Sequence, residues 1–238
     1  PQAPEAEALH DLRANIHLAT GKGEARTLLF TSPGRQDGRS FLAANLAAAV
    51  AATGADVLLV DADLRRPALH QILGVKNERG LADVLLAKRS VRTLLRRTVR
   101  QVGQEHLWLL TAGQPVTNPS LVLASSRLRE GFDVLKKRFQ LVIIDGPAEG
   151  LAPDAGILAS LADATVLVVR PGSTRQEQAW RCKQAITRAP GANLVGVVFN
   201  RAPIDRGQPW RGTVPLERPI AVAKATGEEA KPARERSA

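Results

Sequence analysis

The stretch PGRQDGRS, residues 33–40, lies between an apolar, strand-like run and an alanine-rich, helix-like run. A strand, a Gly-containing turn and a helix with the pattern GxxxxGK[ST] are typical of a phosphate-binding loop, whose backbone N–H groups surround the phosphates. Gly38 and Ser40 occupy the last Gly and the hydroxyl of that pattern, but Arg39 replaces the Lys that reaches the β- and γ-phosphates. The stretch therefore predicts a nucleotide site with an altered cation.

Two further acidic elements directly follow apolar runs. Asp61 and Asp63 come after the run at 57–60, and Asp145 comes after the run at 141–144, just before Gly-Pro. Parallel sheets bind ligands beyond the carboxyl ends of their strands, and an Asp in the place of Asp145 helps to hold Mg²⁺ in phosphate-loop proteins. Each motif alone is also compatible with an ordinary turn or cap. Their order along the chain favours a single site for Mg²⁺ and phosphate at three strand ends.

Short β-rich runs alternate with helical stretches along most of the chain. The runs lie at 27–30, 57–60, 107–110, 141–144, 165–169 and 194–199. Continuous apolar strands separated by helices predict an α/β fold, a P-loop NTPase with a mainly parallel, twisted sheet and helices on both faces.

The chain divides into three parts by composition. Residues 1–24 carry an amphipathic pattern that predicts a leading helix, either an oligomer contact or a packing element. Residues 25–202 form the single nucleotide-binding domain. Residues 203–238 are rich in Pro and Arg and are expected to form a disordered tail.

The net charge, the cysteine count and the length of the apolar runs limit the kinds of protein that this chain can be. With 33 basic and 23 acidic residues, the net charge is +10, which favours anionic partners without choosing among them. The single cysteine, Cys182, excludes an internal disulfide framework and a multi-cysteine metal site. No apolar run approaches the ~18 residues of a membrane span, and the start lacks a signal pattern, so we expect a soluble, cytoplasmic chain.

One segment concentrates positive charge. Residues 88–100 hold six basic residues and no acid, and positions 89, 92, 96 and 100 would fall on one stripe of a helix. Such a stripe suits an anionic membrane surface or an acidic partner, although a solvated helix face is the commoner explanation.

With these motifs, residues 5–202 resemble the bacterial tyrosine kinases (BY-kinases) of capsule and exopolysaccharide assembly. That family is related to the partitioning and division-site ATPases. The most diagnostic stretch is 61–67, where the two acids, Arg65, Arg66 and Pro67 all stand as the family has them. Further matching stretches are 31–40, 80–85, 142–145 and 196–200.

The resemblance implies ATP or ADP with Mg²⁺ as cofactors and assigns roles to particular residues. It places Ser40, Asp61 and Asp145 around Mg²⁺, makes Asp63 the acid nearest the transferred phosphate, and puts Asn200 against the adenine. The candidate catalytic residues are Asp63, Asp61 and Arg39. The rest of the expected nucleotide contacts are Gly34, Arg35, Gln36, Asp37, Gly38, Ser40 and Phe41.

The resemblance also implies partners and a location. A membrane-embedded polysaccharide copolymerase, fused or separate, would hold the domain at the inner face of the plasma membrane. The family's oligomer contact has a Glu and two Arg spaced by three, where this chain has Glu7, His10 and Arg13. Two roles for the leading helix therefore remain equally possible: it forms a homo-oligomer contact, or it only packs against the domain.

Two departures bear on catalysis. Gln36 replaces a family Gly, at a cost of about 1–2 kcal/mol if a positive φ is required there. Arg39 brings a longer, planar cation, and misplacing one preorganised donor lowers a rate by about 10²- to 10³-fold. The chain also contains no Tyr, which excludes autophosphorylation on tyrosine.

These observations favour a nucleotide-binding, catalytically weakened, tyrosine-kinase-like regulator or scaffold of polysaccharide polymerisation and export. One alternative is an active ATP-dependent tyrosine kinase that phosphorylates a partner in trans. Another is a partitioning-type ATPase that binds DNA through its basic surface. Gly34 and Arg35 do not supply the additional Lys that those ATPases carry early in the loop, so nucleic acid is not the expected partner.

Overall fold

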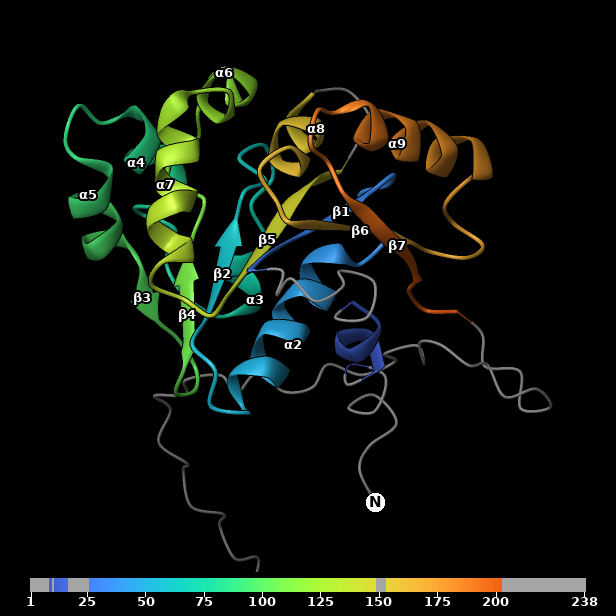
Figure 1. Cartoon of the computed structure of the whole chain (residues 1–238), viewed down its shortest axis with the longest axis horizontal. Helices are drawn as coiled ribbons and strands as arrows, with labels where there is room; N and C mark the ends of the chain where they lie inside the picture. The colour runs from blue at the N-terminus through green and yellow to red at the C-terminus, as the bar shows by residue number, and fades with distance from the viewer. Residues whose placement is uncertain (1–8, 10, 17–25, 149–152, 203–238) are drawn as a thin grey trace, which may run out of the picture.

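A single sheet organises the part of the chain that the computed structural model describes, namely Leu9 and residues 11–16, 26–148 and 153–202 (Figure 1). Its strands are β1 (Thr27–Ser32), β2 (Val57–Asp61), β3 (Arg100–Gln101), β4 (Leu107–Leu110), β5 (Leu141–Ala148), β6 (Ala164–Val169) and β7 (Leu194–Phe199). The helices are α2 (Arg39–Ala51), α3 (Leu69–Ile72), α4 (Leu81–Leu86), α5 (Val91–Thr98), α6 (Pro119–Leu123), α7 (Ser126–Lys136), α8 (Asp154–Ala159) and α9 (Gln176–Arg188).

The strands lie in the order β3-β4-β2-β5-β1-β6-β7, and every neighbouring pair is parallel except β3 with β4. The α/β fold predicted from the sequence is thereby confirmed, and all six predicted runs are strands. In this order β2, β5 and β1 are adjacent at the centre of the sheet. The three motif-bearing strands therefore end side by side.

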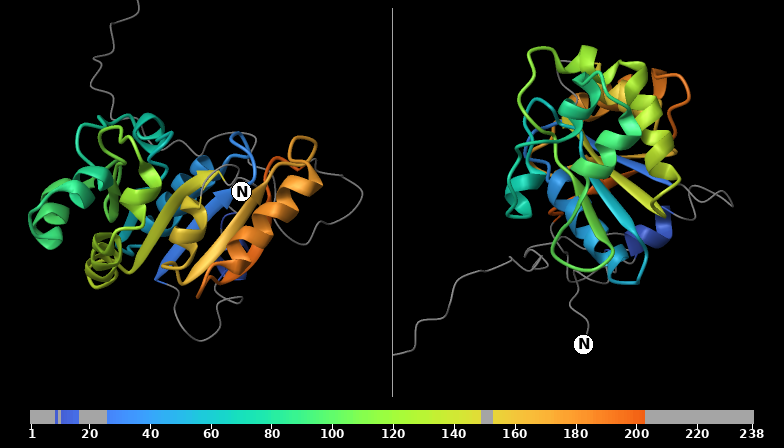
Figure 2. Two further views of the ribbon diagram at one scale, coloured as in Figure 1. Left: turned by 90° about the horizontal axis from the view of Figure 1, so that it is seen from above. Right: turned by 90° about the vertical axis from the view of Figure 1, so that its left-hand side faces the viewer.

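Two hydrophobic cores lie on the two faces of the sheet, because neighbouring strand residues point to opposite faces. Leu28 and Leu59 belong to the core that α2, α3 and the leading helix cover, whereas Leu29 and Leu58 belong to the core beneath α4 to α9. Figure 2 shows these layers from two further sides. No helix in the described part of the chain has both the length and the apolar content of a bilayer span.

The leading helix packs on the domain. Leu9 and residues 11–16 are helical, and Leu9 and Leu12 are buried in the core beside α2. This burial gives the helix a packing role. Of the three residues at the expected oligomer contact, Arg13 is exposed, while Glu7 and His10 lie outside the described residues, as do 1–8 and the tail 203–238.

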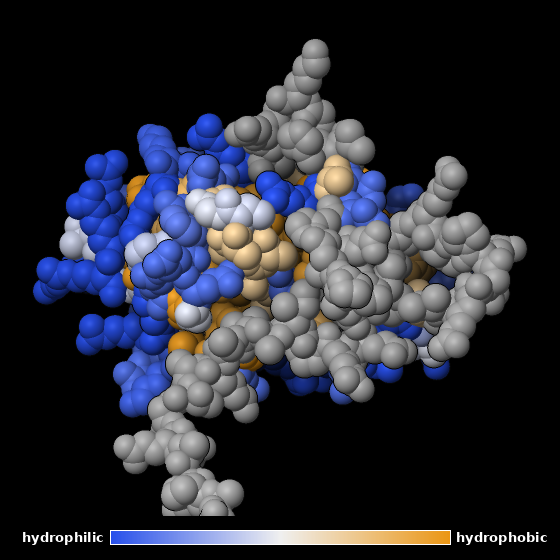
Figure 3. Space-filling view, turned by 90° about the horizontal axis from the view of Figure 1, so that it is seen from below, coloured by the Kyte–Doolittle hydropathy of each residue, from blue (hydrophilic) through white to orange (hydrophobic). Residues whose placement is uncertain are grey.

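The prediction that positions 89, 92, 96 and 100 form one helical stripe is wrong at position 100. Helix α5 ends at Thr98, and Arg100 lies in β3, where its guanidinium donates a hydrogen bond to the carbonyl of Lys76. A two-residue polar strand has no apolar pattern, so the sequence did not predict β3. The remaining basic side chains stay at the surface, and Figure 3 shows hydrophilic side chains over the end of the molecule that carries α5.

The expectation that both faces of the sheet are covered fails at β7. Val197 is 44% exposed and Phe199 is 43% exposed, although the strand is apolar throughout. Strand β7 is the last in the sheet order, so no further strand and helix follow beside it among the described residues. Helix α9 covers this edge only in part.

Candidate functional site

The carboxyl ends of β1, β2 and β5 surround a cavity of about 720 Å³. Its lining comes from the loop after β1, the segment after β2 and the end of β5: Pro33, Gly34, Arg35, Arg39, Ser40, Asp63, Arg65, Arg66, Ala68, Pro147 and Ala148, with Asp154 and Gln178. A smaller cavity of about 280 Å³ lies on another side of the loop and is lined by Gln36, Gly38 and Phe41, with Ile72, Arg170 and Arg201, besides Arg35, Arg39 and Ser40. Most of the predicted nucleotide contacts therefore lie on one continuous surface around the loop.

The loop itself is held by Asp37, which is buried. Its carboxylate accepts hydrogen bonds from the N–H of Gly34 (2.7 Å) and from the hydroxyl of Thr174 (2.8 Å). The amide nitrogen of Asn200 donates to the Asp37 carbonyl (2.8 Å). The Asp37 side chain thus shapes the loop, which leaves only its backbone N–H for a phosphate.

Of two loop positions that the sequence singles out, Gly38 fits the pattern and Gln36 lacks the strain considered for it. Gly38 has φ 90°, and a Cβ there would lie 2.0 Å from the Asn200 amide nitrogen, so this position requires glycine. Gln36 is not in the left-handed region, which among described non-Gly residues holds only His106 and Arg201. The anticipated strain at Gln36 is therefore absent. Asn200 is occupied with the loop, and its contact with adenine stays a prediction.

Arg39 turns toward the sheet and not away from it. Its guanidinium donates to the carboxylate of Asp63, to the carbonyl of Gly146, and to the Ser32 hydroxyl at 3.1 Å. Its Nε also lies 3.4 Å from Oδ1 of Asp145. The side chain is only 7% exposed. Arg39 therefore joins Asp63 to the Gly146 carbonyl and lies beside Asp145.

The two buried acids, Asp61 and Asp145, are cross-strand partners in neighbouring β2 and β5. One oxygen of Asp61 accepts hydrogen bonds from the N–H groups of Ala68 and Leu69 (both 3.0 Å), while its Oδ1 has no hydrogen-bond partner. Both carboxylate oxygens of Asp145 also lack one. Unsatisfied buried carboxylate oxygens are unusual, and a cation would satisfy them.

The donor set therefore fits Mg²⁺. Asp145 and the Ser40 hydroxyl offer oxygen ligands, and Asp61, the cross-strand partner of Asp145, has one carboxylate oxygen without a hydrogen-bond partner. No trio of His, Cys, Asp or Glu within the described ranges could hold a metal ion alone. Phosphate oxygens and water would have to complete the coordination, as is usual for Mg²⁺.

Burial raises the pKa of all three acids of the site. For Asp145 it raises the pKa to about 6, against the opposing charge of Arg39 and the Ser40 hydroxyl. For Asp61, burial and the charge of Asp145 raise the pKa well above its usual range. For Asp63, burial raises the pKa although Arg39 opposes it. Burial therefore makes the charged form of each acid less favourable than it is in water.

A pH dependence of stability follows from these shifts. A raised pKa in the folded state contributes stability at low pH that is lost as the pH rises through the folded value, here about 6 for Asp145. We expect the melting temperature of the ligand-free chain to fall by several degrees between about pH 5 and pH 7.5. Asp163 has the opposite effect on stability, because its hydrogen bond with Lys136 lowers its pKa in the folded state. Its contribution is lost only at pH values below that range. Thermal melts across that range test this; a melting temperature that rises through it would contradict the expectation.

The sequence did not predict one polar network at the cavity wall. Arg65 Nε donates to the buried carboxylate of Asp154 (2.8 Å), and Arg65 Nη2 donates to the Ser120 hydroxyl (2.9 Å). The hydrogen bond with Asp154 raises the pKa of Arg65. Asp154 is 89 residues from Arg65, so only the match of both positions to the family pattern could have linked them.

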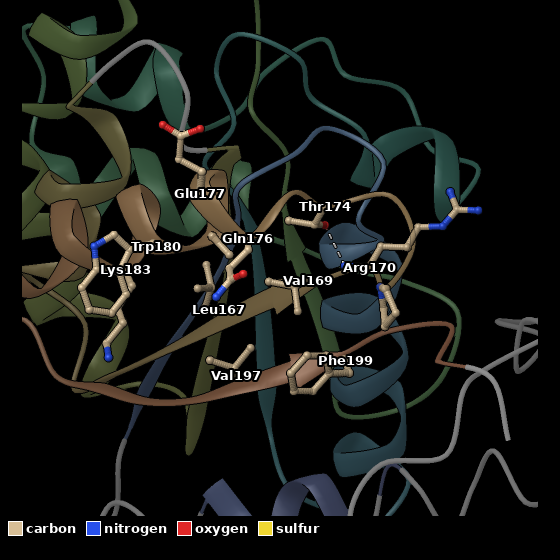
Figure 4. Close-up of a pocket in the computed structure, with 12 residues that line it drawn as sticks. Leu167, Val169, Arg170, Thr174, Gln176, Glu177, Trp180, Lys183, Val197 and Phe199 are labelled. Carbon is tan, nitrogen blue, oxygen red and sulfur yellow. Dashed lines mark hydrogen bonds between the residues drawn. The ribbon is translucent and has the colours of Figure 1, made fainter. Parts of the chain in front are cut away.

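A second large cavity, of about 660 Å³, is mainly apolar and lies between α9 and the edge of the sheet (Figure 4). Its floor is formed by Leu167, Val169, Val197 and Phe199 from β6 and β7, and Trp180 of α9, 55% exposed, stands at its side. It is linked to the phosphate loop through Thr174, which Figure 4 shows bonded to the backbone of Arg170, and through Arg170, which also lines the smaller cavity at the loop. Its composition does not suit a triphosphate.

Comparisons with known proteins agree with this geometry. Residues 34–208 match the family profile described as the CobQ/CobB/MinD/ParA nucleotide binding domain. The chain is 30% identical to the putative tyrosine-protein kinase CapB of Staphylococcus aureus over 210 residues, covering 88% of this chain and 90% of CapB. It belongs to the bacterial tyrosine-kinase (BY-kinase) family. Tyrosine-protein kinase YwqD of Bacillus subtilis is 34% identical, with 84% and 82% covered.

Other members of the BY-kinase family are longer. The putative tyrosine-protein kinase EpsB of Ralstonia solanacearum is 35% identical over 84% of this chain, which spans only 26% of EpsB. Among solved structures, the kinase domain of the Escherichia coli tyrosine kinase ETK superposes with a TM-score of 0.78 at 28% identity, covering 89% of this chain and 81% of that kinase-domain chain. The septum site-determining protein MinD of Pyrococcus horikoshii, complexed with Mg-ADP, superposes with a TM-score of 0.62 at 25% identity, covering 80% and 74%.

Proposed function

We propose that this chain binds ATP or ADP with Mg²⁺ as a catalytically weakened BY-kinase-like domain, and that it regulates or scaffolds a polysaccharide polymerisation and export complex. The observation that carries the proposal is Arg39, whose guanidinium is bound by Asp63 and by the Gly146 carbonyl. A phosphate-loop cation that is committed to the acids of the site serves the phosphates poorly.

The chemistry of each residue follows from its place. Backbone N–H groups of the loop would bind the phosphates, and Ser40 and Asp145 would hold Mg²⁺. When bound, Mg²⁺ neutralises charge on the β- and γ-phosphates. Asp63 would accept a proton from an attacking hydroxyl, a role that its hydrogen bond with Arg39 opposes. Nucleotide binding is therefore less affected than turnover.

The proposed partner is a membrane-embedded copolymerase, which would place the domain at the inner face of the plasma membrane. The support is the resemblance to BY-kinases of capsule assembly, together with a solved chimera named CapA2B2 that superposes with a TM-score of 0.78 at 31% identity. Co-purification of the chain with that copolymerase from its own cells tests the partner. Recovery of the chain without it would refute this part of the proposal.

The first test is paired. At ATP and Mg²⁺ concentrations about 100 times the Kd, binding adds about 2.7 kcal/mol, so we expect the melting temperature to rise by roughly 5–10 °C. Phosphate release should stay near background in the same samples. Rapid hydrolysis that Asp63→Asn abolishes would refute the weakened-enzyme part, and no thermal shift with either nucleotide would refute the nucleotide site.

An active kinase that phosphorylates a partner in trans is the second candidate. It is favoured by similarity to proteins named tyrosine-protein kinases over most of their length, including CapB and YwqD. Labelled phosphate from ATP that appears on tyrosines of a partner, and not with the Asp63→Asn variant, would decide for it.

A further inference from the structure

A basic surface lies at the end of the molecule formed by α4 and α5. It consists of five exposed side chains: Lys88, Arg89, Arg92, Arg96 and Arg97. The 13-residue segment that contains them holds six basic residues and no acid, against a net charge of +10 for the whole chain. This end of the molecule therefore carries a dense local positive charge.

The five side chains of the basic surface make no ion pair or side-chain hydrogen bond within the described residues. Arg100, the sixth base, is by contrast turned inward to the Lys76 carbonyl. The acid before them, Asp83, accepts a hydrogen bond from the Gly80 N–H. Their charge is thus available to an external anion.

Packing fixes the direction in which the basic surface faces. Val91 and Leu95 are buried on the inner side of α5, where they join the core beneath α4 and α7. Arg92 and Arg96, one turn apart, are held on the outer side. Leu86, at the end of α4, is 62% exposed next to this surface. An apolar side chain thus stands beside an unpaired cluster of cations.

We propose that the basic surface and Leu86 dock on the headgroups of an anionic lipid bilayer. Basic residues near such a surface each strengthen binding severalfold, and a protruding Leu can enter the acyl boundary. Nucleic acid fits less well, because no aromatic side chain lies among residues 86–97 to stack on a base. The contact is independent of nucleotide binding and so goes beyond the proposed function.

The nucleotide cavity stays open in this orientation. No residue of α4 or α5 lines it, since its lining comes from the loop after β1 and from the segments after β2 and β5. Figure 1 shows helix α5 beside β3, which is the strand at one end of the sheet. A domain docked through the basic surface can therefore exchange nucleotide and meet a partner.

Flotation with lipid vesicles tests the proposal on the full chain. We expect binding to phosphatidylcholine vesicles that contain about a quarter phosphatidylglycerol, none to pure phosphatidylcholine, and a strong loss on raising the salt from about 0.1 M to about 0.5 M. Arg92→Gln with Arg96→Gln should weaken the vesicle partition coefficient by about thirtyfold. Leu86→Ser should weaken it severalfold.

The matched control carries the same charge change at the other end of the molecule. Arg175→Gln with Arg188→Gln alters two exposed residues on and before α9 and should leave vesicle binding within about twofold. Equal losses in both double variants, or DNA binding by the chain without vesicle binding, would overturn the proposal. Thermal melts check that both variants fold, and the shift with ATP and Mg²⁺ should persist in each.

Discussion

Arg39→Lys is expected to raise the rate of ATP hydrolysis by about 10²- to 10³-fold. The Arg39 guanidinium donates hydrogen bonds to Asp63, to the Gly146 carbonyl and to Ser32. It is therefore bound by protein groups and is not available to the phosphates. A Lys ammonium is compact and lacks the fork that joins these groups. It can turn to the β- and γ-phosphates, and a preorganised donor in such a place contributes roughly 2.7–4 kcal/mol to the barrier.

The measurement is phosphate release with ATP and Mg²⁺ under single-turnover conditions, with the nucleotide Kd determined separately. Arg129→Lys is the matched control, because Arg129 is an exposed residue of α7 that lines neither cavity of the loop and makes no ion pair within the described residues. We expect no rate change there. If Arg39→Lys leaves the rate at the starting level, the weakness of the site does not come from the guanidinium.

The outcome at Arg39 shows where sequence reasoning reached its limit. The sequence showed that Arg39 replaces a Lys at a known place in the loop. It also predicted that three strand ends converge, because the apolar runs and the order of the motifs along the chain indicate this. The direction of the guanidinium was not readable. It depends on Asp63, 24 residues away, and on the Gly146 carbonyl, 107 residues away, which only the folded sheet brings together.

Other differences have the same physical origin. Strand β3 is the exception, because it pairs with β4 just after it along the chain but is too short and too polar to show a β pattern. The open face at β7 could not be foreseen, because an apolar strand does not reveal whether a helix covers it. The Arg65–Asp154 pair joins distant segments, so local patterns could not assign it. Long-range contacts, and not local propensities, separate prediction from structure here.

Asp145→Asn is expected to stabilise the ligand-free chain while removing its response to Mg²⁺. Asp145 is fully buried, it faces Arg39 at 3.4 Å and the Ser40 hydroxyl, and burial raises its pKa to about 6 in spite of them. At pH 7.5 the folded chain must therefore carry an unfavourable carboxylate. Relieving it should add about 2 kcal/mol, the order set by a pKa shift that already includes the opposing charge of Arg39 at 3.4 Å.

That gain corresponds to a melting temperature about 4–8 °C higher at pH 7.5, and it should shrink toward pH 5, where Asp145 is already protonated. The further rise produced by ATP with Mg²⁺ should be lost, because an amide does not replace the carboxylate as a metal ligand. Asp133→Asn, at an exposed position of α7, is the matched control and should change neither quantity. A destabilised Asp145→Asn variant that still responds to Mg²⁺ would mean that this acid serves the fold and not the metal, and the strain at the centre of the sheet would then need another cause.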